Sequence, residues 1–164
     1  MVCGMDSPTR EPGLENAREI PLESSDGWPD LEGIHVMLIE DNSDTRLMVD
    51  EALRHCGAVV TTYESAAVAL EHLSEFLPMV FICDLSMPGL DGMQFMKRIR
   101  ALPADRGGST PALAVTAYDA RYAASAAQDA GFNAYLTKPL RLDLLCTVVK
   151  ELAARAGSPK LRAA

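Results

Sequence analysis

The chain has 164 residues, of which 48% are hydrophobic and 23% charged, enough apolar material for one folded domain with additional segments. No apolar run approaches the roughly 20 residues of a membrane span, and the first residues lack the basic-then-apolar order of a secretion signal. The net charge of −8 lies mostly in residues 1–32, which carry eight acids against two arginines. The nearly neutral remainder lacks the basic surface of a nucleic-acid binder. We therefore expect a cytoplasmic protein with no membrane or nucleic-acid partner.

The cysteines and the amino-terminal segment carry no predicted chemistry. Cys3, Cys56, Cys83 and Cys146 form no C-x-x-C pair and have no histidine at metal-ligand spacing, so we expect reduced, mostly buried thiols. Residues 1–32 contain four prolines, many charges and few large apolar groups, which predicts a disordered acidic extension. Trp28 and Leu31 could still dock on the folded part. Residues 33–155 are predicted to form the domain and 156–164 a short carboxyl-terminal tail.

Five short apolar runs alternate with helical patterns along the chain. Apolar runs at 34–39, 58–62, 79–83, 112–115 and 133–136 predict strands. Helices are predicted at 43–56, at 66–73 behind a Ser65 cap, and at 91–102, 119–130 and 141–154. Their inward faces include Leu47, Met48, Ala52, Leu53 and Cys56 in the first and Leu145, Val148, Val149 and Leu152 in the last. Residues 103–111 are rich in proline and glycine, which predicts a loop.

This alternation predicts an α/β fold. Strands that are apolar at every position are typical of a parallel sheet covered on both faces. Right-handed crossovers then give an open, doubly wound sheet of five strands flanked by five helices. Such a sheet binds its ligand outside the carboxyl ends of the strands, near a switch point in strand order.

Polar side chains follow four of the predicted strands. Glu40 and Asp41 follow the first, Asp84 the third and Thr116 the fourth, and Lys138 comes shortly after the fifth. Because parallel strands end at one edge, these groups should converge. Each pair of carboxylates about 4 Å apart would repel by roughly 4 kcal/mol at an effective dielectric near 20, so a cation or a proton must neutralise them. An all-oxygen cluster of this kind suits Mg²⁺, with Mn²⁺ as a substitute.

The remaining groups suit a phosphoryl group. An ammonium and a hydroxyl can contact phosphate oxygens that a metal also binds, which is most of what phosphoryl transfer requires. Carboxylates can form aspartyl-phosphates, and Asp84 is the expected acceptor because it stands alone while Glu40 and Asp41 are paired.

The sequence resembles the receiver domains of response regulators over about residues 34–155. The resemblance rests on the acidic pair at 40–41, D-L-S-M-P-G-L-D-G at 84–92, T-A at 116–117 and Y-L-T-K-P at 135–139. It implies a flavodoxin-like sheet with strand order 2-1-3-4-5. Glu40 stands where many members have aspartate.

The resemblance also implies roles for individual residues. Asp84 would be the phosphoacceptor, and Thr116 and Lys138 would contact the phosphoryl group. Glu40, Asp41, Asp84 and the backbone carbonyl of Ser86 would bind Mg²⁺. Thr116 and Tyr135 would form the switch pair, and a cis bond is expected between Lys138 and Pro139.

The implied function is that of a signalling switch and not of an enzyme, apart from self-catalysed phosphoryl uptake and autodephosphorylation. The phosphodonor would be a histidine kinase or a histidine phosphotransfer protein, and the output would pass to an unidentified downstream protein. A homodimer could form through the surface of the fourth helix, fifth strand and fifth helix.

Two alternatives stay open. One is a receiver-like interaction module that is never phosphorylated. The other is a phosphatase of the haloacid dehalogenase type, whose Asp-x-Asp-x-Thr motif does not match the spacing of residues 40–45. Taken singly, Glu40-Asp41 and Lys138 could be solvated surface groups, Asp84 and Thr116 turn residues, and Tyr135 a core residue.

Overall fold

Five parallel strands form the centre of the molecule. The computed structural model describes residues 27–117 and 123–157. The strands are β1 (His35–Ile39), β2 (Val59–Tyr63), β3 (Val80–Asp84), β4 (Ala112–Thr116) and β5 (Ala134–Thr137). They pair in parallel in the order β2-β1-β3-β4-β5, which confirms the predicted fold class. All five residues of β3 and of β4 are buried, because helices cover both faces of the sheet.

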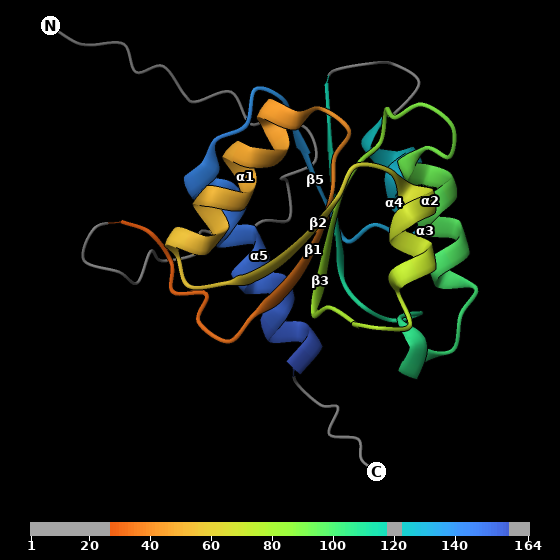
Figure 1. The fold of residues 1–164 in the computed structure, drawn as a ribbon, viewed down its shortest axis with the longest axis horizontal. Coiled ribbons are helices and arrows are strands. Elements are labelled where there is room, and N and C mark those ends of the chain that lie inside the picture. Colours follow the sequence, from red (N-terminus) through yellow and green to blue (C-terminus); the bar gives the residue numbers. More distant parts are fainter. Residues whose placement is uncertain (1–26, 118–122, 158–164) are drawn as a thin grey trace, which may run out of the picture.

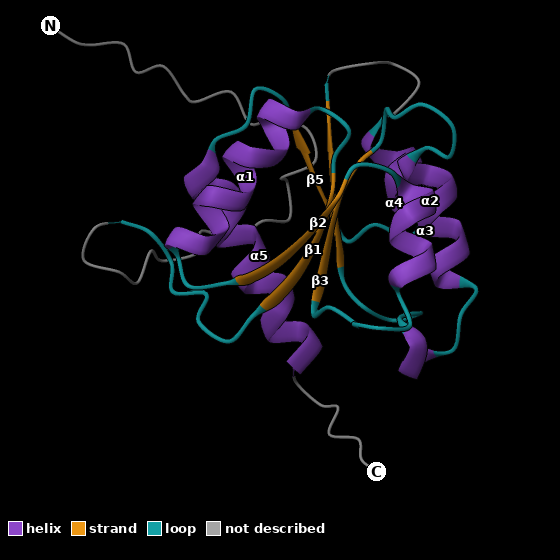
Figure 2. Ribbon diagram, viewed as in Figure 1, coloured by secondary structure: helices purple, strands orange, loops and turns teal. Residues whose placement is uncertain are grey.

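The helices divide into two layers. They are α1 (Ser43–His55), α2 (Ala66–His72), α3 (Gly92–Arg100), α4 (Ala124–Ala130) and α5 (Leu142–Gly157). Helices α1 and α5 cover one face of the sheet, and α2, α3 and α4 cover the other (Figures 1 and 2). Asn42, Ser65 and Asp91 accept hydrogen bonds from the first turns of α1, α2 and α3, which fixes where these helices begin. Over the ranges described, every helix is too short or too polar to cross a lipid bilayer.

Each helical layer buries its own core against the sheet. The apolar residues predicted to face inward on α5 are all buried in the core shared with α1. The prediction for α1 was partly wrong, since Leu47 and Met48 are 57% and 41% exposed. The buried stripe on α1 comprises Val49, Ala52 and Leu53 and continues to Cys56, a spacing that keeps these side chains on one side of the helix.

Some helices and loops begin or end at other residues than predicted. The predicted loop 103–111 contains a 3-10 helix, η1 (Ala104–Arg106), which starts after Pro103 and ends at Gly107 with a φ of +110°. Glycine adopts this conformation without a Cβ clash. Helix α4 begins at Ala124, because the backbone of Ala123 is extended; the prediction that residue 123 is helical is therefore wrong. Residues 119–122, where the helix was predicted to begin, lie outside the described residues.

The packed unit starts before the predicted boundary at residue 33. Residues 27–33, here called the N-terminal strap, lie against the end of α1. Leu31 is completely buried, and its backbone N–H donates to the carbonyl of Cys56 at 2.7 Å. The ring of Trp28 meets that of His55 edge-on, with the ring centroids 5.8 Å apart. Burial of the leucine side chain contributes about 1.5–3 kcal/mol toward holding this segment against the domain. Residues 1–26 and 158–164 lie outside the described residues.

Candidate functional site: an acidic pocket at the carboxyl edge of the sheet

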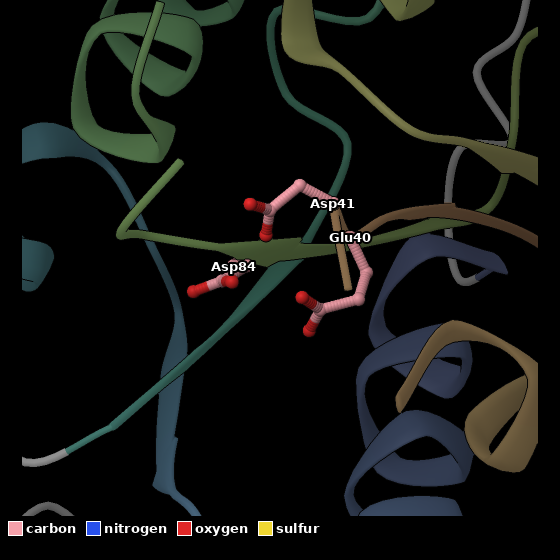
Figure 3. Close-up of side chains that lie close together, drawn as sticks. All are labelled: Glu40, Asp41 and Asp84. Atoms are coloured by element: carbon pink, nitrogen blue, oxygen red, sulfur yellow. The ribbon is translucent and has the colours of Figure 1, made fainter. Parts of the chain in front are cut away.

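The predicted site residues meet where the parallel strands end. Asp84 is the last residue of β3, and Glu40 and Asp41 directly follow β1, its neighbour in the sheet. Oxygen atoms of the three carboxyl groups all lie within 4.8 Å of one another. In Figure 3 the three side chains extend from two adjacent strand ends and surround one small region. The sequence-based expectation that these carboxylates converge is confirmed.

Burial distinguishes the three acids. Glu40 and Asp84 are only 2% and 4% exposed, whereas Asp41 is exposed. Two carboxylates are thus almost withdrawn from water and the third is at the mouth of the pocket. Charges in such a place require partners, because burial without compensation is costly.

Lys138 supplies the compensating cation. Its Nζ lies 3.0 Å from Oε1 of Glu40 and 3.4 Å from Oδ2 of Asp84. The peptide bond between Lys138 and Pro139 is cis, as the resemblance implied. The backbone N–H of Lys138 donates to the carbonyl of Thr116 at 2.9 Å, which ties the segment after β5 to the end of β4. The lysine therefore reaches Asp84 from two strands away and Glu40 from three strands away.

Backbone groups fix the orientation of the buried carboxylates. The N–H of Ser86 donates to Oδ1 of Asp84 at 3.0 Å, and the N–H of Asn42 donates to Oε2 of Glu40 at 3.2 Å. Nη1 of Arg46 donates to the carbonyl of Glu40 at 2.8 Å, which anchors the turn after β1 to α1. Sequence reasoning missed Asn42 and Arg46. The only signal was the position of Asn42 as a helix cap, and nothing in the sequence marked the contact of Arg46.

The electrostatics reflect crowding of like charges. Burial, followed by the hydrogen bond and charge of Asp84, raises the pKa of Glu40 from 4.5 to about 7, although Lys138 and Asn42 act in the opposite direction. Burial alone would lower the pKa of Lys138, but its contacts with Glu40 and Asp84 outweigh burial and raise it. Near neutral pH a fraction of the molecules thus carries a proton on Glu40, which a bound cation would displace.

Thr116 ends the strand next to that of Asp84, and Tyr135 lies one strand further on. Thr116 ends β4 next to β3 and is fully buried, yet its hydroxyl has no hydrogen-bond partner among the described residues. A buried hydroxyl without a partner costs about 1–3 kcal/mol, and such groups call for an explanation. Tyr135 lies in β5 with its side chain buried in the core beneath α2, α3 and α4. The two residues occupy adjacent strands, and their role as a switch pair remains a prediction.

The donor set fits a hard divalent cation. Three carboxylates from two strand ends offer oxygen ligands, and the exposed Asp41 leaves the site open to water and to a phosphate. Burial and the neighbouring Asp84 raise the pKa of Glu40, so a cation bound beside these acids would favour their ionised forms. The role predicted for the Ser86 carbonyl remains a prediction.

The strand order reverses between β1 and β3, and the acids lie at this switch point, where doubly wound sheets bind their ligands. Residues 36–150 match the family model of the response regulator receiver domain. The chain belongs to this family, whose members are receiver domains of two-component systems.

Individual relatives agree with this assignment. The chain is 39% identical over 105 residues to an uncharacterized 14.6 kDa protein of Leptolyngbya boryana, covering 64% of this chain and 79% of that protein. It is 33% identical over 115 residues to the DNA-binding transcriptional regulator NtrC of Escherichia coli K12, covering 70% of this chain but 24% of NtrC. A crystal structure of a protein from Chloroflexus aurantiacus J-10-fl, described as a response regulator, superimposes with a TM-score of 0.70 at 33% identity, covering 74% of this chain and 98% of the other.

Proposed function

We propose that this chain is the phosphoacceptor of a two-component phosphorelay and that Asp84 receives the phosphoryl group. The observation that carries the proposal is the position of Asp84. Its carboxylate is buried at the end of the central strand, with Nζ of Lys138 3.4 Å away and carboxylate oxygens of Glu40 and Asp41 within 4.8 Å. The donor would be a phosphohistidine on a histidine kinase or a histidine phosphotransfer protein.

In the proposed reaction an Asp84 oxygen attacks the phosphorus. The new O–P bond forms as the P–N bond to the histidine breaks, and the leaving imidazole keeps the electron pair and gains a proton. Lys138, already close to this carboxylate, balances charge on the phosphoryl oxygens. Uptake and later hydrolysis on Asp84 would be the only chemistry, so the chain would act as a switch and not as an enzyme with turnover on other substrates.

Glu40, Asp41 and Asp84, with the Ser86 carbonyl, would hold Mg²⁺ or Mn²⁺, which when bound neutralises the acids and the charge of the phosphoryl group. The chain's own contribution is to fix the acids. The N–H groups of Ser86 and Asn42 orient Asp84 and Glu40, and Arg46 holds the turn that carries Asp41.

The switch would begin at Thr116. A phosphoryl group brings about −1.5 to −2 charge and three acceptor oxygens close to a buried hydroxyl that has no partner in the described structure. Movement of Thr116 toward these oxygens would free space for the Tyr135 ring and reshape the surface of α4, β5 and α5. We expect Thr116→Ala to remain phosphorylatable but to weaken partner binding to this surface. Equal binding by both proteins in both states would contradict the switch.

Incubation with acetyl phosphate and MgCl₂, followed by intact-mass spectrometry, tests the proposal directly. The wild type should gain one phosphoryl group, and Asp84→Asn should gain none. A wild type that never gains this mass would favour the unphosphorylated interaction module. Sustained release of phosphate from small phosphoesters would favour the phosphatase, although the acids at 40 and 41 do not have that family's motif spacing.

Partners and location follow from the proposed donor. A phosphohistidine donor of the two-component kind implies a cytoplasmic protein whose output is a contact with another protein. The surface of α4, β5 and α5 is the proposed contact and could also join two copies of the chain. Light scattering before and after phosphorylation would reveal such a dimer.

A further inference from the structure

The first residue of α3 packs directly on the backbone of β3, the strand that ends in Asp84. Gly92 begins α3 and is buried. A Cβ placed on it would collide with the backbone oxygen of Asp84 and lie 2.8 Å from Cα of Leu85. Carbon atoms in ordinary contact are about 3.5–4.0 Å apart, so no side chain fits here. Because Gly92 lies in the helix and outside the left-handed region of φ, the requirement is for space and not for an unusual backbone conformation.

The turn between β3 and α3 is held at both of its ends. The N–H of Gly92 donates to the carbonyl of Leu85 at 3.1 Å, and the N–H of Leu85 donates to the carbonyl of Val115 in β4 at 3.1 Å. The Leu85 side chain is completely buried. The residue directly after Asp84 is therefore tied to both α3 and β4, and movement away from an atom added at residue 92 would strain these bonds.

Helix α3 is also fixed where it meets this turn. The Asp91 side chain accepts a hydrogen bond from the N–H of Gln94 at 2.9 Å, and the Gln94 side chain accepts one from the N–H of Asp91 at 3.0 Å. This capping box holds the first turn of the helix. Phe95 and Met96 are completely buried in the core beneath α2, α3 and α4. A side chain at residue 92 would thus displace either the backbone after β3 or the packed start of α3, and neither is a flexible group.

The same backbone orients the carboxylate of Asp84. The N–H of Ser86, one residue beyond Leu85, donates to Oδ1 of Asp84 at 3.0 Å. Nζ of Lys138 lies 3.4 Å from Oδ2. Displacement of the backbone at residues 84–85 therefore changes both the direction of this carboxylate and its distances from the neighbouring groups of the pocket.

We propose that Gly92 is a positioning residue for phosphoryl uptake and metal binding by Asp84, because only glycine lets α3 pack on the backbone of that residue. The inference rests on the proposed function of Asp84. Gly92 has no side chain to offer a ligand, so it acts only through the place it gives to the Asp84 carboxylate. Relief of the contact with Cα of Leu85 would require a shift of about 1 Å, and a misplacement of that size can slow a reaction about a hundredfold.

The test compares Gly92→Ala with Gly108→Ala, a matched substitution at the opposite edge of the sheet. Gly108 precedes β4, and a Cβ there would collide with the carbonyl oxygen of Leu102 and lie 3.0 Å from that of Pro103. Both substitutions thus force a methyl group against backbone atoms, and both should lower the free energy of unfolding in urea. Only Gly92→Ala does so beside Asp84.

Phosphorylation is followed by intact-mass spectrometry with acetyl phosphate and MgCl₂, and Mg²⁺ binding by calorimetry on the unphosphorylated proteins. We expect Gly92→Ala to take up the phosphoryl group at least about tenfold more slowly than the wild type and to bind Mg²⁺ at least about tenfold more weakly. Gly108→Ala should match the wild type in both measurements. Equal uptake and equal Mg²⁺ affinity in the two variants would overturn the positioning role.

Two readouts separate this role from the proposed function and from a folding defect. A wild type that never gains a phosphoryl group refutes the phosphoacceptor, whereas weaker Mg²⁺ binding by Gly92→Ala alone would still support the positioning of the carboxylate. If Gly92→Ala is partly unfolded, the three proteins are compared in trimethylamine N-oxide, which favours the folded state. A Gly92→Ala protein that behaves normally once refolded, or that stays unfolded, would show that the glycine serves the fold as a whole and would refute the specific role.

Discussion

Glu40→Gln tests how the shifted pKa of Glu40 affects the stability of the metal-free protein. The pKa of Glu40 is raised from 4.5 to about 7 in the folded chain. A group with a raised pKa stabilises the fold fully below its unfolded pKa, and this contribution is lost as the pH rises through the folded pKa. At about 1.4 kcal/mol per pKa unit, the shift corresponds to about 3 kcal/mol between pH 4.5 and pH 8.

Glutamine imitates the protonated acid and does not titrate. In EDTA, the free energy of unfolding of the wild type relative to Glu40→Gln should therefore fall by about 3 kcal/mol from pH 4.5 to pH 8. Urea titrations of both proteins at several pH values measure this difference. The contributions of all other titrating groups cancel, because both proteins contain them. Saturating Mg²⁺ at pH 8 should stabilise the wild type more than Glu40→Gln, because the cation replaces the proton. Parallel pH profiles of the two proteins would refute the electrostatic account of the pocket.

Three further perturbations test other parts of the structure by urea denaturation. Leu31→Ala should lower the free energy of unfolding by about 2–4 kcal/mol through loss of a fully buried side chain, and an unchanged value would show that the strap is not part of the core. Thr116→Val should raise it by about 1 kcal/mol, because the lost hydroxyl has no partner among the described residues; destabilisation would point to a bond not seen here. Lys138→Met at pH 8 in EDTA should lower it by about 3 kcal/mol, as two buried acids lose their cation, and less with Mg²⁺. An equal loss of stability with and without Mg²⁺ would show that the metal does not replace the positive charge of Lys138.

The sequence was most informative where one physical signal dominates. Continuous apolar strands such as β3 and β4 predicted a sheet buried on both faces, and the acids at their ends predicted the pocket, because parallel strands share one carboxyl edge. Periodicity was less reliable at the surface of α1. Leu47 and Met48 are apolar and near the correct spacing, but only contact with α5 and the sheet decides which stripe is buried.

The amino-acid sequence by itself determined the order of the elements, the parallel sheet and the acids that meet at its edge, because periodicity and strand-end residues are local properties. Tertiary structure alone decided that Leu31 belongs to the core, that Arg46 anchors the turn of Glu40, and that the Thr116 hydroxyl is buried with no partner among the described residues. These features join residues from separate elements, and their distances depend on how helices pack on the sheet, which no local pattern encodes.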